Sequence, residues 1–124
     1  MDNAKAYLEQ LEEIQEKHPE FKREAYNFIM IALHDTLKRI GEQRHVSGQE
    51  LSEGIRTYAL DQFGPLVQTV LDYWGIHETF DFGKIVYYLI DEGLMGKTEE
   101  DSIEDFRDVY DFTDAFSHTV EYDI

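Results

Sequence analysis

The stretch FKREAYNFIMIALHDTLKRI, residues 21–40, decides the fold class of this protein. Its apolar residues recur at intervals of three and four, a spacing that places them on one face of an α-helix. They are Phe21, Ala25, Phe28, Ile29, Ala32, Leu33, Leu37 and Ile40. Gly41 follows, and glycine readily adopts the left-handed conformation in which many helices end. We therefore expect a long amphipathic helix that ends at Ile40.

The same periodicity predicts four further helices on either side of this stretch. Residues 4–17 place apolar residues on one stripe and glutamates elsewhere. Ser47-Gly48-Gln49-Glu50 matches a capping box, so a helix should begin there, with apolar spacing that continues to Phe63. Gly64-Pro65 ends that helix and opens another that reaches Trp74. Thr79 can cap a fifth helix that ends near Gly93. The sequence thus predicts a mainly α, compact single domain of five to six helices.

The charge of the chain is strongly negative and unevenly distributed. Its 124 residues contain 27 Asp and Glu against 11 Lys and Arg, for a formal net charge of -16. Residues 46–124 hold 18 of the acids and only four of the bases. Proteins that bind nucleic acid without sequence preference use Lys and Arg to displace counterions from phosphates. We therefore expect no binding to bare nucleic acid and none to an anionic membrane surface.

A chain of this length predicts one domain, residues 1–124, which we divide into three parts. Residues 1–18 form the N-terminal amphipathic helix, residues 20–98 the helical core, and residues 99–124 an acidic, aromatic C-terminal element. That element carries ten acids and one base but also several large aromatic residues. A plain disordered acidic tail lacks such hydrophobic content. We expect the element to pack partly on its own domain.

Residues 69–98 outline a helix-turn-helix, with a short helix, the Trp74-Gly75-Ile76 turn, and a longer helix. A short β-hairpin near residues 94–106 would make this outline winged-helix-like. A degenerate winged-helix, transcription-associated protein is therefore one alternative function. Two observations weigh against DNA binding. The face we expect to be exposed on the longer helix offers one base among Thr79, Asp81, Lys84, Tyr87, Tyr88 and Asp91. The residues after this helix follow helical spacing rather than strand alternation.

Arg44-His45-Val46-Ser47-Gly48-Gln49-Glu50 is the densest polar cluster. A composite catalytic site near Arg44, His45 and Glu50, with Ser47 as nucleophile, is a second alternative. However, no G-x-S-x-G turn surrounds Ser47, and helix capping explains the same residues better. We leave open whether the protein is an enzyme, favour the view that it is not, and assign no catalytic residue.

We also assign no metal ion and no cofactor, and leave open only a metal site assembled from residues that lie far apart in the sequence. The chain has no cysteine, its five histidines never form H-x-x-x-H or H-E-x-x-H, and it lacks nucleotide-binding glycine motifs. Acids at positions 105, 108, 111 and 114 recur every third residue without a calcium-binding loop pattern, so we interpret them as a solvated face. The first ten residues show no secretory signal, and no apolar run approaches the length of a membrane span. We expect a cytoplasmic protein.

Several motifs together resemble a bacterial family of hypothetical proteins. They are RHVSGQEL (residues 44–51), FGP (63–65), WGI (74–76), DFG (81–83) and KTEEDS (97–102). The likeness covers roughly residues 20–117 and excludes the N-terminal helix, which we interpret as an addition. The resemblance implies a bacterial, soluble, single-domain protein. It implies no activity, ligand or partner.

The best-supported hypothesis is a non-enzymatic protein-interaction or adaptor module with an acidic surface. Its carboxylates would face a basic partner protein, because complementary charge steers and orients association. The candidate functional surface comprises Arg44, His45, Gln49, Glu50, Arg56, Asp105, Asp108 and Asp111.

Overall fold

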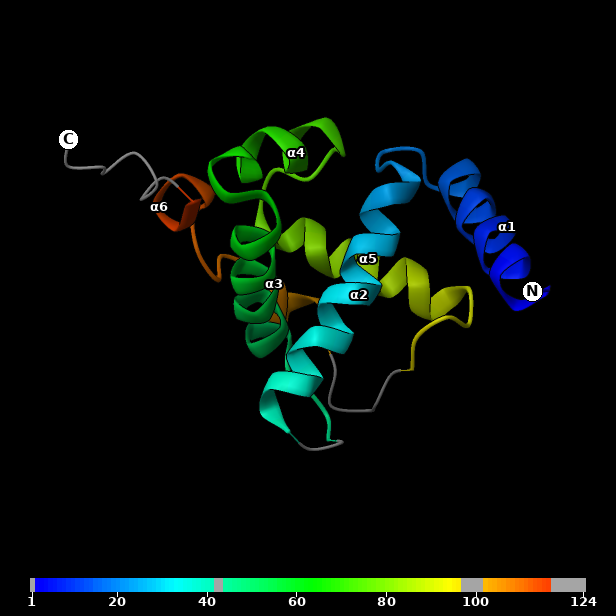
Figure 1. The fold of residues 1–124 in the computed structure, drawn as a ribbon, viewed down its shortest axis with the longest axis horizontal. Helices are drawn as coiled ribbons and strands as arrows, with labels where there is room; N and C mark the ends of the chain where they lie inside the picture. Colours follow the sequence, from blue (N-terminus) through cyan, green and yellow to red (C-terminus); the bar gives the residue numbers. More distant parts are fainter. Residues whose placement is uncertain (1, 42–43, 97–101, 117–124) are drawn as a thin grey trace.

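Helices account for nearly all of the regular structure in the computed structural model, which describes residues 2–41, 44–96 and 102–116 (Figure 1). The described residues form six α-helices, the last only five residues long, and two 3-10 helices. Their bounds are α1 Asp2–Lys17, α2 Arg23–Ile40, α3 Gly48–Phe63, η1 Gly64–Leu66, α4 Val67–Tyr73, α5 Thr79–Asp91, η2 Ile103–Phe106 and α6 Phe112–Phe116. The prediction of a mainly α protein with five to six helices is confirmed.

Local sequence signals explain where α2 ends and where α3 begins. Gly41 has φ 83° and its N–H donates to the Leu37 carbonyl at 3.0 Å, which ends α2 as expected. At the start of α3, the Ser47 hydroxyl accepts from the Glu50 N–H at 3.1 Å. The Glu50 carboxylate accepts in return from the Ser47 N–H at 3.1 Å. The predicted capping box is therefore confirmed.

Helix α5 is the centre of the core, with α2 and α3 packed on it (Figure 1). Its Phe82, Ile85 and Leu89 are fully buried. Helix α2 adds Tyr26 and Ile29. Helix α3 contributes Leu51, Ile55 and Ala59, which are also buried. Burial of this apolar surface is the main force that holds the three helices together.

Helices α2 and α3 are in close contact where Gly54 faces Thr36. A Cβ on Gly54 would overlap the Thr36 hydroxyl oxygen and lie 2.9 Å from its methyl carbon. The Thr36 hydroxyl donates to the Ala32 carbonyl at 2.8 Å, which satisfies this buried polar group. The absence of a side chain at Gly54 therefore sets the distance between the two helices.

Helix α1 packs on the N-terminal half of α2. Its Leu11 and Ile14 are buried, and the Tyr7 hydroxyl donates to Asn27 at 2.9 Å. Two exposed ion pairs, Arg23 with Glu12 and Lys17 with Glu92, add contacts at 2.8 Å. Exposed pairs of this kind contribute little, so the apolar contacts hold α1 in place.

The C-terminal element is attached to α3 and α5 through Phe106. This ring lies against Gly48 of α3 and Gly83 of α5, where a Cβ would come within 3.1 Å and 2.8 Å of it, respectively. The Thr79 hydroxyl donates to the Phe106 carbonyl at 2.7 Å and accepts from the Val109 N–H at 3.1 Å. Thr79 therefore joins α5 to this element instead of capping the helix, and Glu78 is the residue at the N-cap, so the capping role predicted for Thr79 is wrong.

The winged-helix interpretation is not supported. The described parts of the predicted hairpin, residues 94–96 and 102–106, contain no strand, and Ile103–Phe106 form a 3-10 helix. Residues 97–101 lie outside the described part of the chain. Thr79 and Asp81 were expected on an exposed face but are buried, because α5 passes through the core. The face expected to be exposed on α5 therefore loses Thr79 and Asp81 to the core.

Across these described ranges, no helix combines the length and the apolar character that a bilayer crossing requires.

Candidate functional site

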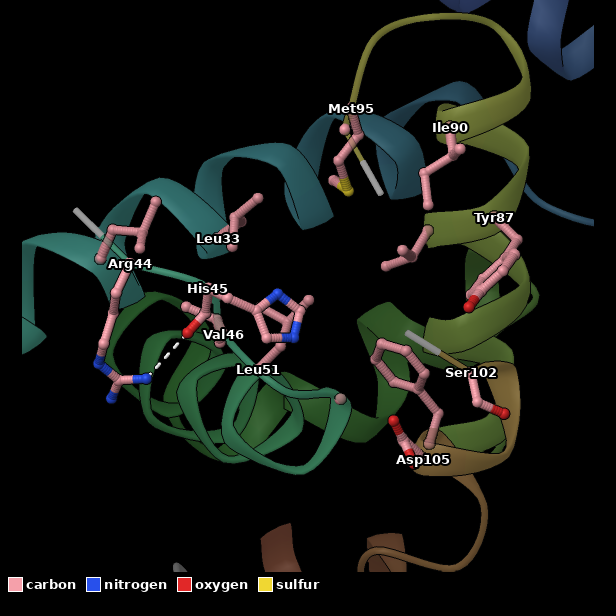
Figure 2. A pocket seen from close by; sticks show the side chains of 15 residues that line it. Leu33, Arg44, His45, Val46, Leu51, Tyr87, Ile90, Met95, Ser102 and Asp105 are labelled. Carbon is pink, nitrogen blue, oxygen red and sulfur yellow. Dashed lines mark hydrogen bonds between the residues drawn. The ribbon is translucent and has the colours of Figure 1, made fainter. Parts of the chain in front are cut away.

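A cavity lies where α2, α3, α5 and η2 meet, next to the loop before α3 (Figure 2). Its volume is about 170 Å³. It is lined by Leu33, Leu37, Arg44, His45, Val46, Gly48, Leu51, Val86, Tyr87, Ile90, Met95, Gly96, Ser102, Asp105 and Phe106. We call it the α2–α5 cavity.

The walls of the α2–α5 cavity are apolar because each of two helices presents a pair of apolar residues one turn apart. Leu33 and Leu37 lie four residues apart on α2, and Val86 and Ile90 are spaced in the same way on α5. Residues at this interval share one face of a helix. Leu51 of α3 adds a further apolar surface between them (Figure 2).

The polar side of the cavity comes from the segment that precedes α3. The Arg44 guanidinium donates to both Glu50 oxygens, at 2.9 and 3.2 Å, and to the His45 carbonyl at 2.9 Å. These bonds hold the segment against the first turn of α3. Figure 2 shows the His45 ring extending into the hollow from this segment. The hydrogen bond from Arg44, reinforced by the Ser47 N–H, lowers the pKa of Glu50 from 4.5 to about 2.

Asp105 reaches the same cavity from a distant part of the sequence. It lies in η2, and Figure 2 shows it at the edge of the hollow beside Ser102. A Cβ on Gly48 would come 2.8 Å from the Cβ of Asp105. The glycine at the first position of α3 thus allows Asp105 to approach that helix. Three predicted surface residues, Arg44, His45 and Asp105, are brought together here.

Two other predicted residues, Gln49 and Glu50, lie beside the cavity on the exposed first turn of α3. Arg56 is half-buried further along α3 and does not line the cavity.

Asp108 and Asp111 line a separate groove of about 270 Å³ at the start of α5. We call this the acidic groove; its lining residues are His77, Glu78, Thr79, Asp108, Tyr110, Asp111 and Phe112. The predicted surface is therefore divided between two sites.

Aromatic contacts hold the wall of the acidic groove against the core. The Phe112 ring stacks on Phe82 with centroids 5.7 Å apart, and Phe116 packs on Phe112 at 5.4 Å. The Tyr110 hydroxyl donates to the Ser52 carbonyl at 2.6 Å. Burial is the main reason that the pKa of Tyr110 lies well above its usual value. Phe116 is buried and Tyr110 and Phe112 are half-buried at the groove, whereas Asp108, Asp111 and Asp114 are exposed.

The hydrogen bonds assign Ser47 and Glu50 to helix capping. Ser47 does not line the cavity, and its hydroxyl accepts from the Glu50 N–H. Glu50 is held by Arg44, so it is not positioned to orient His45 as a base. Within residues 2–41, 44–96 and 102–116, no three His, Asp or Glu side chains gather in a way that could hold a metal ion.

The sequence did not point to the apolar walls or to Met95 and Ser102 as parts of a site. The pairs Leu33–Leu37 and Val86–Ile90 carry the spacing of any core-facing helix, so no local signal separates a cavity wall from a filled core. The cavity depends on how three helices cross.

Comparisons of the chain with protein-family models, curated proteins and solved structures found no match. The resemblance to a bacterial family therefore stays a prediction.

Proposed function

We propose that this protein is a non-enzymatic interaction module that binds a basic segment of a partner protein in the acidic groove. The observation that carries the proposal is the division of residues 102–116 into two faces. Phe106 and Phe116 are buried in the core, while Glu104, Asp108, Asp111 and Asp114 are exposed. An acidic segment that is anchored in this way presents carboxylates from a defined surface.

The composition of the acidic groove suits a Lys or Arg side chain. Glu78, Asp108 and Asp111 supply carboxylates, and Tyr110 and Phe112 supply ring surface. A guanidinium binds carboxylates through paired hydrogen bonds and also stacks on aromatic faces. Charge complementarity of this kind raises association rates and selects partners.

The chain itself contains one example of this contact close to the groove. The Arg107 guanidinium lies 4.1 Å from the centroid of the Phe80 ring and bonds Glu104 at 2.6 Å. The pKa of Glu104 is lowered by this hydrogen bond. A ring and a carboxylate thus hold one arginine together, and the acidic groove offers the same two chemical groups to a partner.

The alternative functions have less support. The winged-helix alternative needs an exposed recognition helix, whereas seven of the thirteen residues of α5 are buried, Thr79 and Asp81 among them. The composite enzyme near Arg44 needs Ser47 and Glu50 for chemistry, and both cap α3.

The test is affinity capture with crosslinking from the source cell, using the wild type and Asp108→Asn/Asp111→Asn. Asn removes both charges but preserves the local structure. Asp108 has φ 52°, which Asn also tolerates, and the Asp111 side chain accepts from the Asp114 N–H at 3.2 Å, as an Asn oxygen can. Glu9→Gln/Asp91→Asn is the control, because it removes two exposed charges elsewhere.

We expect a basic partner that the control variant retains and the groove variant loses. Crosslinks should fall on residues 102–116, and recovery should decrease as salt is raised, because exposed charges are screened. Recovery of the same partners by all three proteins, or of none by the wild type, would refute the proposal.

A further inference from the structure

We propose that the α2–α5 cavity binds a small amphipathic amine, with an apolar body of about the size of one ring and a single ammonium group that pairs with Asp105. This inference does not depend on the acidic groove, which is lined by other residues.

The size of the cavity sets the size of the ligand. Its volume is about 170 Å³. An apolar cavity of about 150 Å³ in another protein is large enough to bind benzene. The α2–α5 cavity therefore holds one ring or a branched aliphatic group of similar volume, and it is too small for a nucleotide or a fused cofactor.

The inner walls select an apolar body. Leu33 and Leu37 line the hollow from α2, and Val86 and Ile90 line it from α5. The Met95 side chain extends toward it from the segment after α5 (Figure 2). A stable buried water needs two to four polar partners, which such walls do not supply. An apolar occupant instead releases ordered solvent and gains close contacts with the walls.

Asp105 places a carboxylate without a counter-ion at the edge of this hollow (Figure 2). Of the residues that the structure describes, none donates a hydrogen bond to this carboxylate or forms an ion pair with it. The side chain is half-buried, so it has lost part of its contact with water. Burial of a charge is costly unless the charge is paired, and a bound cation would supply the missing partner.

The arginine at the same edge is already offset by another carboxylate. The Arg44 guanidinium donates to both oxygens of Glu50, at 2.9 and 3.2 Å. The fixed charges around the hollow therefore sum to a negative value because of Asp105. The rest of the chain adds to this potential, since residues 46–124 hold 18 acids and only four bases.

This negative edge selects an ammonium group over a hydroxyl group or a carboxylate. A hydrogen bond between an ammonium group and a carboxylate is roughly twice as strong as one between two neutral groups. A ligand hydroxyl group lacks the charge and would bind Asp105 more weakly, and a ligand carboxylate would be repelled. Because the neighbouring Ser102 is exposed, an ammonium group at this edge also keeps part of its hydration.

The fold holds Asp105 in this position in the absence of a ligand. Its Cβ lies so close to Gly48 that a Cβ on the glycine would come 2.8 Å from it. The next residue, Phe106, is buried against Gly48 and Gly83, and its carbonyl accepts a 2.7 Å hydrogen bond from the Thr79 hydroxyl. A group that is anchored in this way loses little conformational freedom on binding, which favours affinity.

The cavity is also accessible. Gly96 and Ser102 are exposed, whereas Leu51, Val86 and Phe106 are buried. The exposed residues thus mark the opening, and the buried apolar residues mark the interior. A ligand would enter with its ring first and keep its ammonium group at the opening, beside Asp105.

The experiment is an NMR titration of the full chain with three probes that share a phenyl ring: phenethylamine, phenylethanol and phenylacetate. We expect phenethylamine to bind in the millimolar range, with amide shifts concentrated on the residues that line the cavity. Phenylethanol should bind about fivefold more weakly, which is the difference between a charged and a neutral hydrogen bond. Phenylacetate should bind at least about tenfold more weakly, because Asp105 repels it.

Asp105→Asn tests the charge. It keeps the Cβ beside Gly48 and the shape of the side chain, so the variant should fold. It should weaken phenethylamine binding by about fivefold and leave phenylethanol binding unchanged. Asp114→Asn is the matched control, because it removes an exposed charge on α6 outside the cavity lining, and it should leave both affinities unchanged.

Val86→Phe tests the location. The added ring would fill the hollow and should abolish the binding of phenethylamine and of phenylethanol. Should this buried variant fail to fold, the amide shifts and Asp105→Asn still locate the site.

Four results would overturn the proposal. They are no phenethylamine binding at millimolar concentration, phenylethanol binding as tightly as phenethylamine, phenethylamine affinity that Asp105→Asn leaves at the wild-type value, and an equal loss of affinity in Asp114→Asn.

Discussion

Replacement of Gly54 by alanine should destabilise the protein although alanine is the better helix former. Gly54 lies inside α3 and faces Thr36 of α2. The new Cβ would overlap the Thr36 hydroxyl oxygen and lie 2.9 Å and 3.0 Å from its Cγ2 and Cβ. Thr36 is only 5% exposed, so it has little room to move. The helices must separate, or the threonine must change its rotamer.

The expected change in the free energy of unfolding follows from two destabilising contributions and one stabilising contribution. Overpacking of a filled contact costs about 1–3 kcal/mol. A rotated Thr36 also loses its 2.8 Å hydrogen bond to the Ala32 carbonyl, about 1 kcal/mol. The gain in helix propensity from Gly to Ala offsets about 1 kcal/mol of this. The free energy of unfolding should therefore fall by about 1–3 kcal/mol.

The assay is urea unfolding followed by far-ultraviolet circular dichroism, in a double-mutant cycle with Thr36→Ala. That second change removes the overlapping oxygen and the methyl group, so the double variant should be more stable than the sum of the single effects by about 1 kcal/mol or more. Thr57→Ala, on the exposed face of α3, controls for propensity and should change stability by at most about 0.5 kcal/mol. If Gly54→Ala matches or exceeds the wild type, the packing argument is wrong.

Three further predictions concern the residues around the two sites. Gly83→Ala brings a Cβ within 2.8 Å of the Phe106 ring, and the cost of overpacking exceeds the gain in helix propensity, so stability in the same assay should fall by up to about 2 kcal/mol. A variant as stable as the wild type would contradict the packing of Phe106. Glu50 has a pKa of about 2, below its usual 4.5, so it stabilises the fold above pH 4.5, and this contribution is lost as the pH falls toward 2. Glu50→Gln should therefore be less stable than the wild type at pH 7, by less than about 1 kcal/mol because the ion pair with Arg44 is exposed. This difference in stability should vanish near pH 2. A difference that does not depend on pH would argue against a stabilising role of the Glu50 charge. Tyr110→Phe removes a 2.6 Å hydrogen bond to an α3 carbonyl and should lower the free energy of unfolding by about 1 kcal/mol. The control Tyr73→Phe, at a side chain that is 71% exposed, should lower it by at most about 0.5 kcal/mol. Equal effects of the two changes would refute the role of the Tyr110 hydroxyl.

The features that could be predicted are those whose cause lies within a few residues. The end of α2 at Gly41 and the capping box at Ser47 both follow from backbone conformation and hydrogen bonds over three or four positions. Helix periodicity likewise acts within each helix. These signals also explain why the capping interpretation of Ser47 and Glu50 was confirmed.

The candidate site could be predicted only in part. Arg44 and His45 were identified because they are adjacent to a recognisable cap. Their proximity to Asp105 depends on Gly48, which lets the C-terminal element approach α3. The sequence cannot show that this glycine contacts a residue more than fifty positions away, and Asp108 was expected on the same surface but lies in another groove.

The sequence by itself therefore determined helices α1 to α5, the end of α2, the start of α3, the absence of cysteine chemistry and the strong acidity of residues 46–124. Only the tertiary structure decided that α5 is central, that Thr79 and Asp81 are buried, and that the candidate residues belong to two separate hollows. The physical reason is that the hydrophobic effect is non-directional. An apolar helix face in the sequence therefore indicates that this face becomes buried, but not which other helix it packs against. Close contacts between residues far apart in the sequence, such as Gly54 with Thr36, decide that pairing.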